Sequence, residues 1–244
     1  HIGERFPAGW GELLRAANPD GFFESELIAG IHWRTNPHPL TGAYLAPQQT
    51  RRHAVKVFIP GLFRSDVAFL DRCIATVRDW RSYVVSTRRM LELQPADRTR
   101  AEHVALPPAL EWWCNNYGLI RDLAIRGYPA HVVSYDGFLR DPARVASEVL
   151  AWIGCGDADA AAAVVRPELR TALAVPSDGE LADGIAPRQL EVFDELYDAI
   201  DRERPLVASF VDRLNRTNDE LRPAVLEHQA SVDADTIADI LGRQ

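Results

Sequence analysis

Short apolar runs rich in β-branched residues occur at three places along the chain. They span residues 53–59 (HAVKVFI), 73–77 (CIATV) and 130–135 (AHVVSY). Runs of this length that are bounded by Pro, Gly or charged residues are typical of buried β-strands. The pattern therefore predicts three strands, each shorter than the segments that separate them.

Apolar residues recur at helical spacing in the segments around these runs. Residues 80–93, 107–126 and 141–154 show this period. Pro95 follows the first segment, Pro107 begins the second and Gly154 ends the third. Near the amino end, residues 22–31 follow a turn-forming Asn-Pro-Asp-Gly sequence and are also expected to be helical. The chain thus alternates predicted strands with predicted helices.

This alternation decides the expected fold class. Strands separated by helices of this length are typical of parallel βαβ units, so we expect a layered α/β fold with a parallel sheet. Beyond about residue 186 the pattern is helical only, with acidic and basic residues interleaved. We therefore predict an α/β domain over residues 1–185 and a helical carboxy-terminal extension over residues 186–244.

The charge balance argues against one class of partner. The chain of 244 residues has 27 Lys and Arg against 35 Asp and Glu, which gives a net charge of −8. A protein that binds nucleic acid by releasing counterions needs a basic excess. We therefore expect no nucleic-acid partner, although a few well-placed side chains can still bind one phosphate group.

The cysteines and the apolar runs bear on the compartment. Cys73, Cys114 and Cys155 are widely spaced and form no Cys-x-x-Cys pair. This pattern favours buried thiols in a reducing compartment over a disulfide framework or a zinc site. No stretch approaches 18 uninterrupted apolar residues, and charged residues are frequent in the first 30. We expect a cytoplasmic protein without a membrane span, a signal peptide or a metal site.

One predicted strand delivers an arginine directly to the start of a helix. Arg78 follows the run 73–77, and Ser86 lies eight residues later, within the early turns of the next helix. Ligands of open α/β sheets bind at the carboxyl ends of strands, helix starts favour anions, and arginine binds phosphate bidentately. The segment therefore predicts a cradle for one phosphate, unless Asp79 merely caps the helix and the arginines face solvent.

Three segments resemble motifs of sulfotransferases that use 3′-phosphoadenosine 5′-phosphosulfate (PAPS). Residues 78–86 (RDWRSYVVS) are similar to the motif that binds the 3′-phosphate of the nucleotide. Residues 18–24 (NPDGFFE) resemble the Asn-Pro-x-Gly-Tyr-x-Glu signature of a bacterial sulfotransferase-like group. Residues 134–142 (SYDGFLRDP) resemble a third motif, with Gly137 at a position that is usually acidic. The three segments occur in the order expected for the family.

The resemblance implies a fold and a set of nucleotide-binding residues. The fold would be a three-layer α/β structure whose central parallel sheet is of the P-loop nucleotide-kinase and sulfotransferase type. Arg78 and Ser86 would bind the 3′-phosphate of PAPS or of its product, 3′,5′-adenosine bisphosphate (PAP). Tyr135 would flank the adenine, or else be a core tyrosine. Arg170 would reach the nucleotide from the far side, unless it lies on a solvated helix face.

The resemblance also implies a reaction and its catalytic residues. A sulfuryl group would pass from PAPS to a hydroxyl or amine of a small molecule or glycan, without a metal. Lys56 is the only lysine of the chain, and its ammonium group would stabilise the transition-state charge unless it is simply solvated at a strand end. Glu24 is the candidate general base, with His32 and His53 as rivals.

One motif of the family has no counterpart. The Gly-x-Pro-Arg-Ser-Gly-Thr loop that holds the 5′-phosphosulfate has no match before Asn18, and residues 60–66 (PGLFRSD) lack its second glycine and its threonine. The chain starts at His1 and its only methionine is Met90, so we expect the loop to be missing from the amino end rather than lost. A non-catalytic binding or assembly module, or another nucleotide-dependent transferase such as a kinase, stays open.

An aromatic stripe is the last candidate feature. Trp112, Trp113 and Tyr117 lie at helical spacing within the segment 107–126. Apolar walls of this kind can line an acceptor pocket. A stripe at helical spacing more often faces the core, and we expect the core here.

Overall fold

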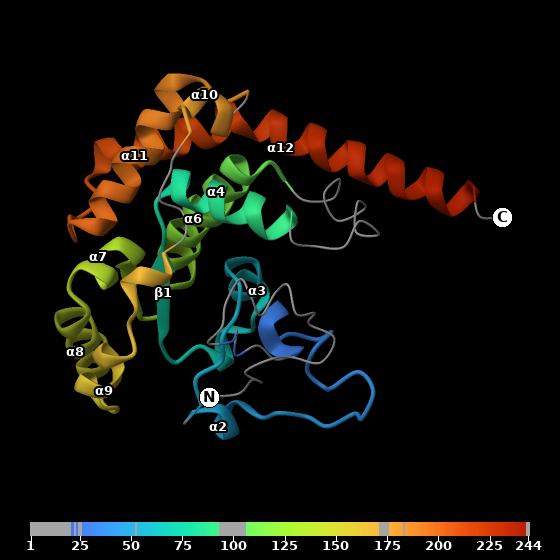
Figure 1. The fold of residues 1–244 in the computed structure, drawn as a ribbon. Helices are drawn as coiled ribbons and strands as arrows, with labels where there is room; N and C mark the ends of the chain where they lie inside the picture. Colours follow the sequence, from blue (N-terminus) through green and yellow to red (C-terminus); the bar gives the residue numbers. More distant parts are fainter. Residues whose placement is uncertain are drawn as a thin grey trace. The chain divides into compact units, whose positions relative to one another are not determined.

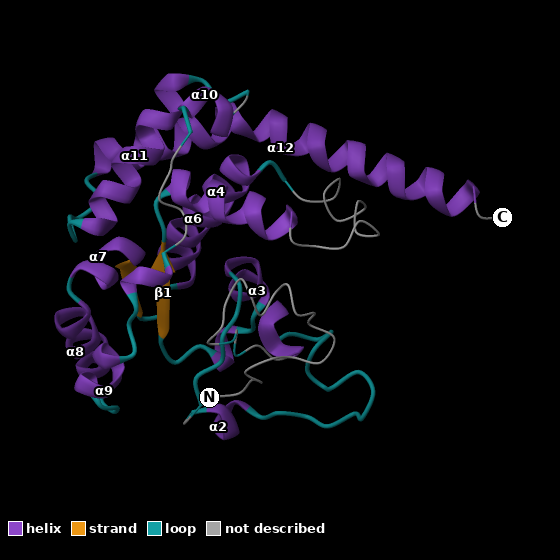
Figure 2. Ribbon diagram, in the orientation of Figure 1, coloured by secondary structure: helices purple, strands orange, loops and turns teal. Residues whose placement is uncertain are grey.

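Helices dominate the structure, and they accompany a small parallel sheet (Figures 1 and 2). The mixed α/β class predicted from the sequence is confirmed at this level. The chain divides into two compact units, and the chain passes from one to the other three times. The first unit consists of residues 1–75 and 118–131, and the second of residues 76–117 and 132–244. The computed structural model describes residues 21, 23, 26–51, 53–92, 106–170, 176–182 and 184–242.

The first unit is built from short helical segments and the last turns of a long helix. The long helix is α6 (Pro108–Arg126), which continues into the second unit. The short segments are η1 (Glu26–Ala29), α2 (Pro47–Thr50), α3 (Ile59–Arg64) and η2 (Val67–Phe69). The helix predicted over residues 22–31 is therefore reduced to η1 in its described part, since residues 22, 24 and 25 lie outside the described residues.

The strand predicted over residues 53–59 is wrong. Residues 53–58 form no strand: among them only Val55 makes an isolated bridge, and α3 begins at Ile59. Pro60 lies in the first turn of α3, where its fixed φ suits a helix and its missing N–H costs nothing. A β-branched composition favours a strand, but a strand also needs a partner for its ladder, and the described residues provide none beyond this bridge.

Two glycines let η1 and α3 meet through their backbones. A Cβ atom on Gly30 would lie 2.1 Å from the carbonyl oxygen of Gly61, and Gly30 has a φ of +100°. A Cβ atom on Gly61 would lie 2.6 Å from the oxygen of Ile28. Arg126 then closes the end of α3, because its guanidinium donates to the carbonyls of Phe63 and Ser65 at 3.1 and 2.6 Å.

Strands β1 (Cys73–Val77) and β2 (Ala130–Ser134) pair in the two-stranded parallel sheet. Both strand predictions are confirmed. The chain between them forms α4 (Trp80–Glu92) and α6, which agree closely with the helices predicted over residues 80–93 and 107–126. These elements form one βαβ-type connection, in which α4 and α6 are the helices of the described residues between the strands.

The core of the second unit is aromatic. Trp80, Trp112 and Trp113 are almost completely buried and surround Phe193. The ring of Phe193 stacks on Trp113 at a centroid distance of 4.8 Å and meets the edge of Trp80 at 6.2 Å. Because Trp112 and Trp113 face this core, the core assignment of the aromatic stripe is confirmed for them. Tyr117, by contrast, is partly exposed and donates a hydrogen bond to Asn215.

The remaining elements of the second unit are all helical. The helix predicted over residues 141–154 is confirmed as α8, which Asp141 caps by accepting a hydrogen bond from the Arg144 amide at 3.2 Å. No helix among the described residues is both long and apolar enough to cross a membrane. In order, the elements are α7 (Tyr135–Arg140), α8 (Pro142–Ile153), α9 (Ala158–Ala163), η4 (Pro167–Leu169), α10 (Asp178–Leu181), α11 (Pro187–Asp201) and α12 (Ala208–Gly242).

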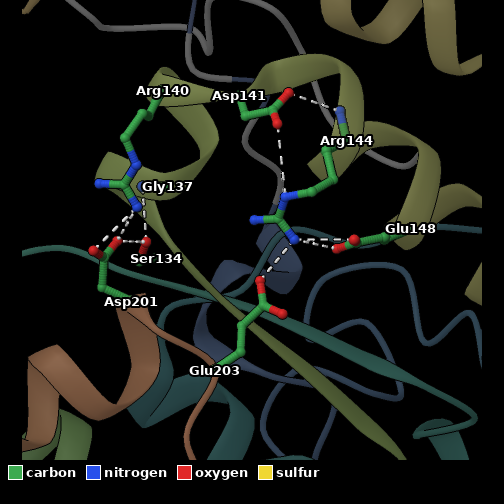
Figure 3. Close-up of polar contacts among 8 residues, drawn as sticks. All are labelled: Ser134, Gly137, Arg140, Asp141, Arg144, Glu148, Asp201 and Glu203. Carbon is green, nitrogen blue, oxygen red and sulfur yellow. Dashed lines mark hydrogen bonds and ion pairs between the residues drawn. The ribbon is translucent and has the colours of Figure 1, made fainter.

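A polar network connects the end of β2 to the end of α11 (Figure 3). The Ser134 hydroxyl, which also caps α7, donates to the carboxylate of Asp201. Arg140 binds the same carboxylate at 3.1 Å. From α8, Arg144 forms a 2.8 Å ion pair with Glu203. These contacts hold α7 and α8 against the carboxyl end of α11.

Candidate functional site

Arg78 lies immediately after β1, and its backbone is fixed from two sides. The carbonyl oxygen of Arg78 accepts a hydrogen bond from the indole of Trp112 at 2.7 Å. Asp79 caps α4 by accepting from the Ser82 amide at 3.0 Å. Asp79 therefore caps the helix, as the alternative interpretation predicted. That alternative also predicted that the arginine side chain faces solvent, which does not hold for Arg78.

The side chain of Arg78 is directed into the second unit. Its guanidinium lies over the ring of Tyr135, 4.8 Å from the centroid. Its Nε atom is buried and has no hydrogen-bond partner among the residues that the structure describes. A buried donor without an acceptor is unfavourable, because it loses water without gaining a replacement. The position therefore suits an anion that accepts from this N–H group.

Arg170 belongs to the same cluster. Its Nη1 atom lies 2.7 Å from Oδ1 of Asp136, and its Nη2 atom donates to the Ser82 hydroxyl over a longer 3.4 Å. The Nε atom of Arg170, like that of Arg78, is buried without a partner in the described part of the chain. Tyr197 of α11 donates to the second oxygen of Asp136 and so fixes the carboxylate that holds Arg170. Arg170 is thus not on a solvated helix face.

The electrostatic balance of the cluster is positive. Burial lowers the pKa of the Arg78 guanidinium, and the nearby charge of Arg170 acts in the same direction. Tyr135 and Asp136 oppose these effects and favour the charged form of Arg78. Two guanidinium groups thus lie near each other. Asp136 forms an ion pair with Arg170 alone, and the charge of Asp79 also favours the charged form of Arg78. A bound phosphate would relieve the repulsion between the two arginines.

Ser86 lies one helical turn beyond Ser82 on α4. Residues four apart lie on the same helix face, so Ser86 lies on the α4 face that contacts Arg170 through Ser82. Its side chain is half-buried. We name the group Arg78, Ser82, Tyr135, Asp136 and Arg170 the arginine cluster. All five residues belong to the second unit, at the carboxyl ends of β1 and β2 and beside η4.

Three residues of this site were not identified from the sequence. Ser82 had an available signal, because it precedes Ser86 by one helical turn. Asp136 stood beside Tyr135 in the third motif-like segment, but nothing in the sequence paired it with Arg170. Tyr197 lies 61 residues after Asp136, and no local pattern connects the two.

None of the predicted catalytic residues belongs to the arginine cluster. Lys56 is an exposed residue of the segment 53–58, in the first unit. Glu24 lies outside the described residues. His32 is half-buried and accepts from the Arg34 amide at 3.3 Å, whereas the exposed His53 contacts the carbonyl of Gln49 at 3.0 Å.

A cavity of about 270 Å³ lies between α10 and α11. Asp178, Asp194 and Glu191 are among its lining residues. Arg81 pairs with both aspartates, at 2.7 Å to Asp178 and 2.5 Å to Asp194. Three carboxylates around one cavity would repel a phosphate, so this cavity does not compete with the arginine cluster as a nucleotide site.

The comparisons with known proteins add no family. No family model matches the chain, and the searches of curated proteins and of solved structures find no match either.

Proposed function

We propose that the arginine cluster binds the 3′-phosphate of PAPS and that the protein is a sulfotransferase acting on a hydroxyl or amine of a small molecule or glycan. The observation that carries this proposal is the pair of buried guanidinium Nε atoms, on Arg78 and Arg170, that have no acceptor among the described residues. An arginine fork binds phosphate through two parallel hydrogen bonds. The resemblance of residues 78–86 to the 3′-phosphate motif supports the choice of nucleotide.

The residues of the cluster have distinct roles in this proposal. Arg78 and Arg170 donate to the phosphate oxygens, and the hydroxyls of Ser82 and Ser86 complete the cradle from the face of α4. Asp136 keeps Arg170 in position through the 2.7 Å ion pair. The Tyr135 ring, already in contact with Arg78, flanks the nucleotide base. The proposal includes a three-layer α/β fold of the P-loop type, in which β1 and β2 are two strands of the central parallel sheet.

The proposed chemistry is an in-line transfer. The acceptor oxygen or nitrogen attacks the sulfur atom, the bond between sulfur and the bridging phosphate oxygen breaks, and PAP leaves. Lys56 stabilises the charge that develops on the bridging oxygen, as cations do in phosphoryl transfer. Glu24 takes the proton of the acceptor.

A second candidate function is a module that binds the nucleotide without transferring sulfate. It is favoured by one sequence observation: residues 1–244 contain no match to the Gly-x-Pro-Arg-Ser-Gly-Thr loop. Both functions use the arginine cluster to bind the nucleotide, but only the sulfotransferase transfers the sulfuryl group. Binding and transfer must therefore be measured separately.

Thermal denaturation in the presence of PAP tests the shared step. At about 100 times its dissociation constant, a ligand of the folded state adds roughly 2.7 kcal/mol of stability, which corresponds to about 5–10 °C for a chain of this size. We expect this rise with PAP and a smaller one with 5′-AMP, which lacks the 3′-phosphate. If millimolar PAP does not raise the melting temperature of a folded sample, the proposed nucleotide site is refuted.

Variants locate the binding site. Arg78→Ala, Arg170→Ala and Ser86→Ala should each weaken PAP binding, the arginine variants by about 10- to 100-fold, since hydrogen bonds to charged groups are the strong ones. Arg121→Ala is the matched control, because Arg121 is exposed on α6 outside the cluster. Binding of PAP without transfer from PAPS across a panel of hydroxyl and amine acceptors would establish the non-catalytic module instead.

A further inference from the structure

The segment over residues 27–65 carries a charge opposite to that of the whole chain. It contains five Lys and Arg residues and no Asp or Glu, although the complete chain has a net charge of −8. It also contains three histidines. Between Glu26 and Asp66, these 39 residues therefore carry only positive charge on an otherwise acidic protein, and a local excess of positive charge attracts an anionic surface.

The same segment exposes large apolar side chains. Trp33, Leu40 and Tyr44 are 77%, 89% and 60% exposed, and all three lie in the loop that joins η1 to α2 (Figure 1). We name residues 33–44 the docking loop. Single exposed apolar residues are normal on a protein surface, but three large ones within twelve residues of a short loop mark a contact site.

Hydrogen bonds hold the docking loop in one shape. The Asn36 side chain donates to and accepts from the Leu45 backbone, both at 2.8 Å, and so closes the loop at its base. At the tip, Nδ1 of His38 accepts from the amides of Leu40 and Thr41 at 3.2 and 3.1 Å. Because the loop is already ordered, binding through its apolar side chains costs little further conformational entropy.

The apolar and basic groups of the loop lie next to each other. The guanidinium of the exposed Arg34 lies over the Trp33 ring, 4.7 Å from its centroid. An indole with an adjacent guanidinium matches the boundary between lipid headgroups and acyl chains, where the ring enters the boundary and the cation contacts phosphates. The basic residues around the loop add attraction to an anionic leaflet.

We propose that the docking loop attaches the protein to the surface of an anionic bilayer, with Trp33, Leu40 and Tyr44 in the headgroup boundary. A soluble polyanion would use the arginines and the aromatic faces equally well. It gives no reason for the 89% exposure of Leu40, because an aliphatic side chain neither stacks on a sugar or base nor donates a hydrogen bond. Contact with an apolar phase is what favours this side chain. This inference is independent of the nucleotide site.

Vesicle co-sedimentation of the complete chain tests the proposal. We expect the protein to bind vesicles of phosphatidylcholine mixed with phosphatidylserine, to bind pure phosphatidylcholine vesicles weakly, and to lose binding as salt rises. The double variant Trp33→Ser/Leu40→Ser should weaken binding to mixed vesicles by about tenfold or more. The double variant Arg34→Glu/Arg51→Glu should bind mixed vesicles no better than pure phosphatidylcholine vesicles.

The matched control is Ile125→Ser/Val164→Ser, which removes two apolar side chains of similar exposure, 69% and 74%, elsewhere on the surface. It should bind mixed vesicles like the unchanged chain, with the same circular dichroism spectrum. The proposal is overturned if the folded chain does not bind mixed vesicles, or if the control loses as much binding as the loop variant. Two other outcomes would also overturn it: mixed-vesicle binding that is unchanged in Trp33→Ser/Leu40→Ser and is matched by binding to heparin, or self-association through the loop without lipid.

Discussion

At the scale of single residues, the helix caps and the arginine cluster differ in how their polar groups are satisfied. Asp79, Ser134 and Asp141 each accept a helix-capping amide, so their side chains have structural partners. The Nε atoms of Arg78 and Arg170 are buried without an acceptor among the described residues. Folding does not favour such donors by itself, and this contrast is why we place the binding function there.

Glu111 on α6 is a second residue with an altered environment. Burial raises the pKa of this carboxyl, and a hydrogen bond with Tyr83 lowers it in part. Three residues later on the same helix face, burial and the nearby Glu111 raise the pKa of the Cys114 thiol to about 11. Cys114 is therefore a weakly reactive thiol. The expectation of buried thiols is confirmed for Cys73 and wrong for Cys155, which is exposed.

The raised pKa of Glu111 predicts a pH-dependent stability. Since the folded pKa lies above the unfolded one, the unfolded chain releases this proton first, and Glu111 costs stability as pH rises through the folded pKa. Glu111→Gln should therefore melt at a higher temperature than the unchanged chain at about pH 7 and at a similar temperature near pH 4.

The control for this experiment is Glu191→Gln, which alters an exposed glutamate of α11. It should leave the melting temperature unchanged at both pH values, as surface substitutions usually do. An equal gain in both variants would assign the effect to net charge. If Glu111→Gln does not raise the melting temperature at neutral pH, burial of the Glu111 carboxylate does not destabilise the fold.

At the scale of elements, capping residues predicted helix boundaries more reliably than apolar runs predicted strands. Asp141 and Pro142 start α8, and Gly154 ends it in the left-handed region with a φ of +83°. These signals act within a few residues and need no distant partner. Residues 53–59 failed as a strand because a strand needs a neighbour, and a neighbour is a property of the tertiary structure.

The cap of α8 gives a direct prediction. Asp141→Ala removes the acceptor of the Arg144 amide and should lower the free energy of unfolding by about 1 kcal/mol, measured by urea denaturation. Asp141→Asn retains a capping oxygen and should lose much less. If both variants lose the same amount, the surface ion pair of Asp141 with Arg144 at 3.8 Å matters rather than the cap.

Arg81 tethers α4 to both α10 and α11. It forms paired hydrogen bonds with Asp178 and Asp194. The pairing raises the pKa of Arg81 and lowers the pKa of Asp178. Asp178 and Asp194 are nearly half exposed, so solvent screening keeps the contribution of the tether modest.

Arg81→Ala should lower the free energy of unfolding by about 1–2 kcal/mol at neutral pH. Because the folded pKa of Asp178 is depressed, its contribution is present above the unfolded pKa and is lost as pH falls through the folded pKa. The difference from the unchanged chain should therefore shrink in acid, as followed by denaturant titrations at several pH values. Arg89→Ala, an exposed arginine at the end of α4, should show no such difference at any pH.

At the scale of the whole molecule, the carboxy-terminal helices complete a core that begins far upstream. Phe193 of α11 is fully buried among Trp80, Trp112 and Trp113. Residues 186–242 accordingly belong to the same compact unit as α4. The sequence predicted that this region is helical, but it did not predict that the region contributes Phe193 to the core.

Removal of the region after residue 185 should therefore unfold the second unit. The truncated chain would leave three tryptophans without Phe193, and we expect a red-shifted tryptophan fluorescence and loss of the near-ultraviolet circular dichroism. Phe193→Ala in the complete chain should cost about 3–5 kcal/mol, and Phe193→Leu less. A truncated chain with native spectra would show that α11 and α12 form a separate domain.

The sequence by itself determined what depends on neighbours along the chain: the mixed α/β class, strands β1 and β2, the helices α4, α6 and α8 with their caps, and the position of Arg78 after a strand. Helical period, capping chemistry and β-branched composition act within a few residues, so they can be recognised without a fold. Only the tertiary structure decided which of these groups meet. It placed Arg170 and Asp136 beside Arg78, left residues 53–59 without a sheet, and set Phe193 against the tryptophans, because such contacts join residues that no local pattern connects.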